Sequence, residues 1–346
     1  MNISSSSPPG LCALVAVAAA VAVVLILRVL LATGWAWRLA TDIPNHRSLH
    51  TLPTPRVGGL GIVPVCVVLM FAAGRSLWLI GALTFVLALV SQIDDRRGLP
   101  ARVRFAAHLV AVVALLVVYP APAPVWLLVL VGFLMLWLIN LYNFMDGIDG
   151  LAGGMALFGF GAYAFAALGH GQALPELGMS AAAIAGAALG FLFLNFHPAK
   201  LFLGDAGSVP FGFLAGALGY WGWRGNVWPI WFPALVFSPF IGDASITLVR
   251  RLLRGEKFWQ AHREHYYQRM VRLGVGHTAT ALIWYLVMFI GIIIALWALE
   301  RTTIVQWVIV AGWAVVLVLM GAAIDMRWRH LQSLTKSSEV DANGPH

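Results

Sequence analysis

Six aspartates stand where long apolar runs of this sequence end, in positions where carboxylates can do chemistry. They are Asp94, Asp95, Asp146, Asp149, Asp205 and Asp243. A carboxylate at membrane depth is costly, so it marks a functional site by default. Glycines surround several of them, as in "NFMDGIDGLAGG" and "KLFLGDAGS", and allow a ligand to approach the backbone closely. Because Mg²⁺ binds one or two carboxylates together with substrate phosphates, this pattern indicates metal-assisted phosphoryl transfer.

Several of these carboxylates also have a simpler structural interpretation, although a merely solvated position is not expected for Asp243. Asp149 and Asp205 precede apolar segments and could cap the helices that follow. Asp94 could belong to a solvated helix end that Arg96 and Arg97 neutralise. Four separate loops would then have to place carboxylates at one membrane face by coincidence, and a shared site is the simpler hypothesis.

The elements that must position these residues are membrane-spanning helices. The chain has 346 residues, of which 61% are hydrophobic and 10% charged, against about 25% charged in soluble domains. We predict an all-α integral membrane protein with about eleven transmembrane helices, in a single polytopic domain over 1–330 and a disordered cytoplasmic tail over 331–346. The apolar windows are 11–32, 57–73, 77–93, 104–119, 124–142, 152–168, 179–196, 207–223, 228–248, 278–299 and 303–324.

Basic residues predict the orientation of these helices. With the N-terminus outside, eighteen of the 22 Lys and Arg residues fall in inner loops and three in outer loops. The N-terminus is therefore predicted to be periplasmic and the C-terminus cytoplasmic, with the carboxylates and the active site on the cytoplasmic face. The net charge of +8 then needs no nucleic-acid partner, although a basic inner face attracts the phosphates of membrane lipids.

Five motifs in order resemble the polyprenyl-phosphate N-acetylhexosamine-1-phosphate transferases. They are "TPRVGGLGI" (54–62), the aspartate pair 94–95, "NFMDGIDGL" (143–151), "NFHPAKLFLGDAGS" (195–208) and the basic loop "AHREHYYQRMVRLG" (261–274). Together they cover nearly the whole chain. The resemblance implies a glycosyltransferase of the bacterial inner membrane that starts a surface glycan such as O-antigen or a cell-wall polymer.

The resemblance also implies the reaction. A UDP-N-acetylhexosamine would give its sugar 1-phosphate to undecaprenyl phosphate, with UMP as the second product and Mg²⁺, or Mn²⁺ as a substitute, required. Asp205 would bind the metal, and Asp94 would deprotonate or orient the lipid phosphate with Asp95 beside it. Asn143 and Asp146 would complete the catalytic residues.

Substrate-binding residues follow from the same motifs. Asp149, Asn195 and Phe202 would line the uridine pocket, with Phe202 stacked on the base. His265 and Arg269 would contact the diphosphate, and the remaining residues implied in substrate binding are Arg56 and His262. A homodimer is a candidate assembly.

One departure bears on the sugar. Tyr267 and Gln268 stand where members of the family have further histidines, and the His-His-His-Phe-Glu pattern of the peptidoglycan enzymes is absent. A muramyl-pentapeptide donor is therefore not expected. The loop looks like that of O-antigen initiators acting on N-acetylfucosamine or N-acetylquinovosamine, and N-acetylglucosamine stays open.

Two alternatives stay open at this stage. A secondary transporter could also use intramembrane carboxylates, but it would place them near the bilayer midplane in repeated segments. Within the transferase interpretation, direct attack by the lipid phosphate competes with a covalent aspartyl intermediate.

Overall fold

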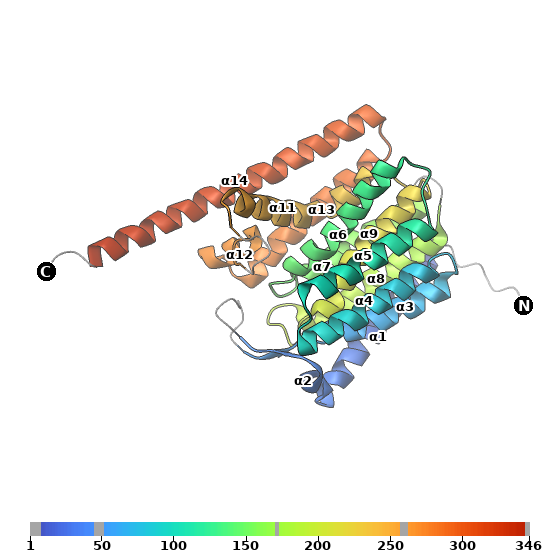
Figure 1. Ribbon diagram of the computed structural model, residues 1–346, viewed down its shortest axis with the longest axis horizontal. Coiled ribbons are helices and arrows are strands. Elements are labelled where there is room, and N and C mark those ends of the chain that lie inside the picture. The colour runs from blue at the N-terminus through green and yellow to red at the C-terminus, as the bar shows by residue number, and fades with distance from the viewer. Residues whose placement is uncertain (1–7, 45–51, 170–172, 257–261, 343–346) are drawn as a thin grey trace, which may run out of the picture.

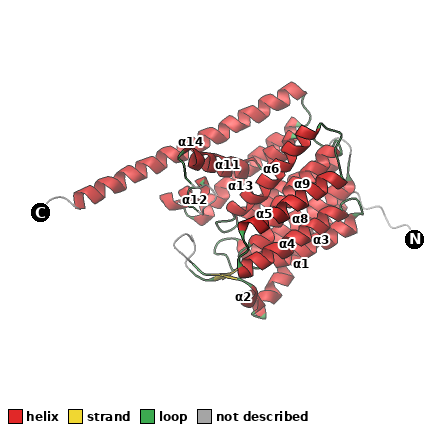
Figure 2. Ribbon diagram, viewed as in Figure 1, coloured by secondary structure: helices red, strands yellow, loops and turns green. Residues whose placement is uncertain are grey.

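A computed structural model of the protein describes residues 8–44, 52–169, 173–256 and 262–342. In these residues the chain is almost entirely helical, as Figure 2 shows, which confirms the all-α prediction. A single small hairpin interrupts the helices, made of β1 (Thr41–Asp42) and β2 (Thr54–Pro55) in antiparallel register with Thr41 opposite Pro55.

Every predicted apolar window overlaps a helix of this structure, because uninterrupted apolar sequence has no other way to satisfy its backbone in lipid. One window, 228–248, is divided between two helices that meet at Phe237. The long helices are α1 (Pro8–Ala32), α3 (Gly58–Ala73), α4 (Trp78–Arg97), α5 (Ala101–Val118), α6 (Val125–Phe144), α7 (Leu151–Gly169), α8 (Pro175–Asn195), α9 (Asp205–Arg224), α11 (Ser238–Leu253), α13 (His277–Ala298) and α14 (Thr303–Ala342). The short ones are α2 (Trp35–Leu39), α10 (Trp231–Val236) and α12 (Tyr266–Met270), which continues into an irregular turn over 271–275.

Eight helices in the described ranges are long and apolar enough to cross a membrane. A ninth, α3, is apolar but shorter. The count of eleven crossings and the orientation stay predictions. Figure 1 shows the start of α1 and the end of α14 at opposite ends of the bundle. Two residues of the charge count, Arg47 and Lys257, lie outside the described residues.

Helix α14 runs without interruption through the boundary predicted at residue 330. It packs against the bundle along one side and then projects beyond it, as Figure 1 shows. The last four residues of the predicted tail, 343–346, lie outside the described residues. The proposed division of the chain at 330 therefore does not coincide with a helix end.

Small residues let the central helices approach each other closely, as their spacing predicts. A Cβ added to Gly186 or Gly190 of α8 would lie 2.0 Å from the carbonyl oxygen of Ala16 or 2.4 Å from that of Ala20 in α1. A Cβ on Gly212 of α9 would lie 2.7 Å from a backbone carbon of α6. Helices α8 and α9 are accordingly buried along most of their length.

Glycines also lock the first motif onto the fourth. The N–H groups of Gly58 and Gly59 donate to the carbonyls of Phe202 and Leu203, at 2.9 and 3.0 Å. A Cβ on Gly59 would lie 2.3 Å from the backbone of Ala206. The start of α3 therefore has no room for side chains where it supports the loop that leads into α9.

Candidate active site

Asp94, Asp95 and Asp205 lie together where α4 ends and α9 begins. The two outer carboxylates, Asp94 and Asp205, flank the same guanidinium, that of Arg104, at 3.0 and 3.8 Å. Asp95 is buried and accepts a hydrogen bond from the N–H of Ala206 at 3.1 Å. Asp95 therefore caps α9 and fixes the backbone beside Asp205. Of the three, Asp205 is the most exposed, with 24% of its side chain accessible.

Asn143 and Asp146 join this group from the end of α6. The Asn143 Oδ1 accepts a hydrogen bond from the Ser208 hydroxyl at 2.8 Å, which ties α6 to α9. Burial and the negative charge of Asp205 raise the pKa of Asp146 to about 7. The charge of Arg56 opposes this shift, whereas those of Asp95 and Asp149 add to it. Negative charge is therefore in excess here, which favours a bound cation.

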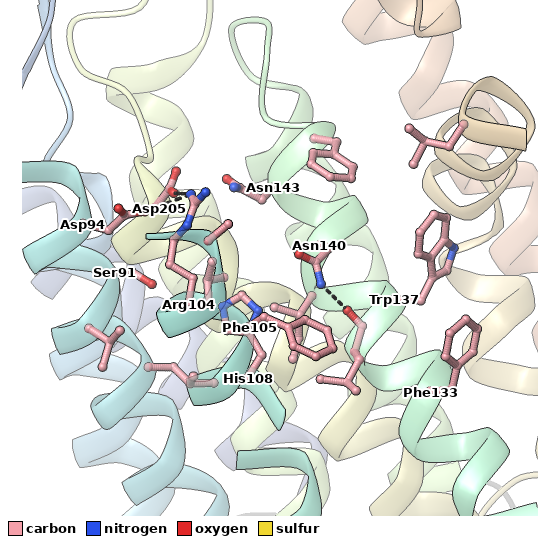
Figure 3. Close-up of a pocket in the computed structure, with 18 residues that line it drawn as sticks. Ser91, Asp94, Arg104, Phe105, His108, Phe133, Trp137, Asn140, Asn143 and Asp205 are labelled. Carbon is pink, nitrogen blue, oxygen red and sulfur yellow. Dashed lines mark hydrogen bonds and ion pairs between the residues drawn. The ribbon is translucent and has the colours of Figure 1, made fainter. Parts of the chain in front are cut away.

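A cavity of about 380 Å³ opens beside these carboxylates, between α4, α5, α6, α9 and α11. Its polar end contains Asp94, Arg104, Asn143 and Asp205. Figure 3 shows Asp94, Arg104 and Asp205 close together. Trp137, on the apolar wall, lies well away from them. The remaining wall is mostly apolar and includes Leu87, Val90, Ala101, Phe105, Phe133, Leu136, Trp137, Ile139, Phe144, Val209 and Leu248, with Ser91, His108 and Asn140 as its polar residues. Such a cavity suits an amphiphile with a phosphate head.

The second carboxylate of "NFMDGIDG", Asp149, lies in a different place. Its Oδ2 accepts hydrogen bonds from the His197 ring at 2.6 Å and from the N–H of Ala199 at 3.1 Å. The His197 ring stacks on that of His277, with centroids 5.2 Å apart. Both bonds go to one oxygen, so Oδ1 can still receive a hydrogen bond from a ligand. Asp149 is therefore hydrogen-bonded to the loop between α8 and α9.

Asn195 connects the two loops around Asp149. Its Oδ1 accepts from the N–H of Gly150 at 2.9 Å, and its Nδ2 donates to the carbonyl of Leu201 at 3.0 Å. Asn195 is buried, and so are both partners. The side chain thus braces the loop after α6 against the loop before α9.

Phe202 and Arg56 lie side by side on the hairpin edge of the site. The two residues form a parallel bridge, and the N–H of Phe202 donates to the carbonyl of Pro55 at 2.8 Å. Phe202 is half-buried, so part of its ring is accessible. The Arg56 guanidinium pairs with Asp42 at 2.7 Å and lies 3.9 Å from Asp95. Both residues are placed where they could contact a nucleotide held near Asp95.

Asp243 organises the basic loop that leads into α12. It is buried and accepts hydrogen bonds from the N–H groups of Tyr266 and Tyr267, at 2.8 and 3.1 Å, and from the His265 ring at 3.2 Å. It also accepts from the Thr247 hydroxyl at 3.3 Å. Tyr266 and Tyr267 are the first two residues of α12, so the Asp243 carboxylate serves as the cap of that helix.

Tyr267 and Gln268, which stand where histidines were expected, both form hydrogen bonds to the backbone. Gln268 Oε1 accepts from the N–H of His265 at 3.3 Å. The Tyr267 hydroxyl donates to the carbonyl of Phe144 at 3.1 Å and lies against Gly147. This tyrosine therefore joins α12 to the end of α6, beside the motif 143–151.

The predicted diphosphate contacts separate into two groups. The rings of His262 and His265 are 4.8 Å apart, and the His265 ring stacks toward Phe144 at 6.4 Å, close to the end of α6. Burial and the charge of His265 lower the pKa of His262 to about 4, so His262 is neutral near pH 7. Arg269 instead pairs with Asp325 of α14 at 2.7 Å and lines a second cavity. The structure does not bring Arg269 to the carboxylates.

Sequence reasoning missed several residues of the site. Arg104 was counted only as a loop charge, yet it contacts both Asp94 and Asp205. His108, one helical turn further along α5, lines the cavity, and its Nδ1 has no hydrogen-bond partner in the described part of the chain. Arg104 and His108 are four residues apart near the start of α5, so they lie on the same face of that helix. This spacing was the signal in the sequence that could have placed both in the site. His197 was quoted within its motif but given no role.

Among the described residues, two sets have the chemistry to hold a metal. Asp205 and Asp146 offer carboxylate oxygens in a region of excess negative charge, with Asn143 nearby, and this donor set fits Mg²⁺. Asp149, His197 and His277 form the other group, with ligand atoms within 4.8 Å of one another. Its nitrogen donors suit a transition metal better than Mg²⁺. The predicted metal residue, Asp205, is thus in an environment suited to Mg²⁺.

Comparison with known proteins identifies the family. The sequence model of glycosyl transferase family 4 matches residues 77–222. A probable undecaprenyl-phosphate N-acetylglucosaminyl 1-phosphate transferase of Bacillus subtilis is 31% identical over 77% of this chain and 78% of its own length. A decaprenyl-phosphate N-acetylglucosaminephosphotransferase of Mycolicibacterium smegmatis is 32% identical over 76% of this chain and 77% of its own length. The chain belongs to the polyprenyl-phosphate N-acetylhexosamine-1-phosphate transferase family.

This membership confirms the family that the five motifs indicated. It makes the protein a multi-pass membrane enzyme that transfers a sugar phosphate to a polyprenyl phosphate. The similarity to a phospho-N-acetylmuramoyl-pentapeptide-transferase of Geobacillus thermodenitrificans, 36% identical, covers 38% of this chain and 45% of the relative. The longer matches are thus to relatives named as N-acetylglucosamine phosphate transferases.

Proposed function

We propose that the protein transfers the sugar 1-phosphate of a UDP-N-acetylhexosamine to undecaprenyl phosphate, releasing UMP. The donor sugar is of the N-acetylglucosamine, N-acetylfucosamine or N-acetylquinovosamine type, and the lipid-linked product begins an O-antigen or a related surface glycan. The observation that carries this proposal is the cavity whose apolar wall leads to Asp94, Arg104 and Asp205. It joins a lipid-compatible space to phosphate-handling groups.

In this proposal the acceptor lies in the cavity with its phosphate at the polar end. Arg104 holds that phosphate, and Asp94, 3.0 Å from the Arg104 guanidinium, keeps it oriented and deprotonated. An oxygen of the lipid phosphate attacks the sugar-linked phosphorus of the donor, and the bond to the UMP phosphate breaks. Asp95 acts through the backbone, because it fixes the start of α9 and so the position of Asp205.

Mg²⁺ is the proposed cofactor, with Asp205 as its ligand and Asp146 next to it. When bound, the ion would neutralise charge on the donor diphosphate. Asn143 keeps the ends of α6 and α9 together through Ser208, so the spacing of Asp146 and Asp205 is maintained. Removal of divalent cations is expected to stop turnover.

The uridine is proposed to bind between the motif at 143–151 and the loop before α9. Phe202, which is partly exposed, would stack on the base, and the free Oδ1 of Asp149 would receive the uracil N–H. Asn195 shapes this pocket by holding its two loops together. His262 and His265 stand near the same end of α6 and would face the diphosphate, with His262 as a neutral hydrogen-bonding group.

The membrane arrangement is part of the proposal. The N-terminus is periplasmic, the C-terminus is cytoplasmic and the carboxylates face the cytoplasm of the inner membrane, where nucleotide sugars are available. A cysteine at Gly255, in the loop after α11, should resist an impermeant thiol reagent in intact cells, and Arg224→Cys should react. The reverse pattern would contradict this orientation.

A donor panel tests the reaction itself. Purified protein with undecaprenyl phosphate, Mg²⁺ and each UDP-N-acetylhexosamine should release UMP and form a lipid diphospho-sugar visible by mass spectrometry. UMP release that does not depend on the lipid, or no product with any N-acetylhexosamine, would contradict the proposal. Asp94 lies near the end of α4 and Asp205 at the start of α9, rather than in the middle of these helices, which argues against the transporter alternative.

A further inference from the structure

Five arginines converge on a second cavity, formed by α11, α12, the turn that follows it and α14. It has a volume of about 630 Å³ and shares no lining residue with the cavity beside Asp94 and Asp205. Its charged residues are Arg250, Arg254, Arg269, Arg272 and Arg329, with Glu264 and Asp325. Positive charge therefore exceeds negative charge by three. Arginines that only oriented the protein in the membrane would not need to share one cavity.

The two carboxylates are already occupied by three of these arginines. Asp325 pairs with Arg250 at 2.5 Å and with Arg269 at 2.7 Å. Glu264 pairs with Arg254 at 2.5 Å, and it lies 3.5 Å from Arg269. These pairs fix the guanidiniums in place around the cavity, so a ligand would not have to order them.

Arg272 and Arg329 make no ion pair with any residue in the described ranges of the chain. Arg272 lies over the ring of Trp328, 4.6 Å from its centroid, and donates a long hydrogen bond of 3.4 Å to the carbonyl of Arg263. Stacking holds this guanidinium without neutralising its charge. Arg329, which follows Trp328 in α14, is exposed. Two uncompensated positive charges therefore face one space.

The surroundings of the cavity favour an amphiphilic anion. Leu252 and Leu253, between the lining residues Arg250 and Arg254 on α11, are 58% and 81% exposed. Met326 of α14, next to Asp325, is 62% exposed. At this level α14 also passes from its apolar stretch to a basic one. Exposed apolar side chains beside arginines suit acyl chains beside a phosphate.

We infer that this cavity binds the phosphate of an anionic phospholipid, at a site separate from the one that carries out the transfer. Arginine donates two parallel hydrogen bonds to a phosphate, and several arginines around one space can hold a diester group from more than one side. The bound phosphate would neutralise the excess charge between α12 and α14. It would thereby stabilise the loop that begins at His262.

Thermal melting of the full-length protein in detergent, with added lipid, tests this inference. Phosphatidylglycerol should raise the melting temperature of the wild type, and phosphatidylcholine should not. The double variant Arg272→Gln/Arg329→Gln should need about a hundredfold more phosphatidylglycerol for half of the effect, since each arginine contributes at least one hydrogen bond to a charged group and each such bond contributes about tenfold. Its transferase activity in phosphatidylcholine should equal that of the wild type, because neither residue belongs to the proposed catalytic site.

A matched control removes two arginines of the same face that do not line the cavity. Arg97→Gln/Arg327→Gln lowers the net charge by the same amount and should keep the wild-type response. If this control lost the response equally, the effect would be general surface attraction and the inference would fail.

Inorganic phosphate at the same concentrations separates a lipid site from a free-anion site, and an equal rise in melting temperature with phosphate would refute the lipid assignment. If the double variant does not fold, Arg329→Gln alone gives the same comparison, because this side chain is exposed.

Discussion

Replacing Asn195 by alanine should destabilise the protein more than it weakens nucleotide contacts. Asn195 joins two loops of the site through hydrogen bonds of 2.9 Å to the N–H of Gly150 and 3.0 Å to the carbonyl of Leu201. Alanine would leave both of these buried backbone groups without that partner. Each such loss costs about 1–2 kcal/mol, so the expected destabilisation is about 2–4 kcal/mol.

The assay is thermal melting of the purified variant in detergent, in the absence of nucleotide. A destabilisation of this size should lower the melting temperature by about 5 °C or more. Asn140→Ala is the matched control, because within the described part of the chain the Asn140 amide bonds only to the carbonyl of Leu136 in its own helix. Its removal leaves that carbonyl in the helical hydrogen-bond ladder, and the melting temperature should change by only a few degrees.

Calorimetry of UMP binding shows whether Asn195 only holds the two loops together or also contacts the nucleotide. Below its melting temperature Asn195→Ala should still bind UMP, with an affinity reduced less than that of Asp149→Asn, which removes the carboxylate proposed to recognise uracil. If Asn195→Ala melted like the wild type and lost UMP binding, Asn195 would be a nucleotide ligand. The account of its two hydrogen bonds as a structural brace would then be refuted.

Three further predictions concern the carboxylates and their neighbours. Asp205→Asn should weaken the apparent Mg²⁺ affinity, whereas Asp94→Asn should lower turnover with UMP binding intact, and calorimetry with initial rates distinguishes them. Burial raises the pKa of both Asp146 and Asp205 to about 7, so both carboxyls are protonated below that pH, and protons compete with the metal for them. Apparent Mg²⁺ affinity should rise as pH increases through 7, and Asp146→Asn should weaken this dependence without abolishing it, because Asp205 still titrates. Gly147→Ala places a Cβ 2.0 Å from the Tyr267 hydroxyl oxygen and should cost about 1–3 kcal/mol in stability. Adding Tyr267→Phe should restore part of the melting temperature, and no recovery would contradict the contact.

Carboxylates that lie far apart in sequence could be assigned to one site before the fold was known. The apolar windows place the ends of α4, α6 and α8 and the start of α9 on one side, so Asp94, Asp146 and Asp205 had to share a face. Family membership confirmed the transfer of a sugar phosphate to a polyprenyl phosphate, whereas the role of Mg²⁺ stays a prediction. Their individual roles stay predictions, because those depend on ligands.

The sequence by itself determined the helices, their approximate limits and the group of aspartates at one end, because hydrophobic length and local motifs carry that information. The tertiary structure decided which way each side chain points. It brought Arg104 to Asp94 and Asp205, turned Arg269 toward Asp325, and made Asp243 the cap of α12. The physical reason is that helices buried on all sides, such as α8 and α9, have no polar face to fix their rotation from sequence. Only packing against neighbours many residues away sets that rotation, and with it the partners of each charged group.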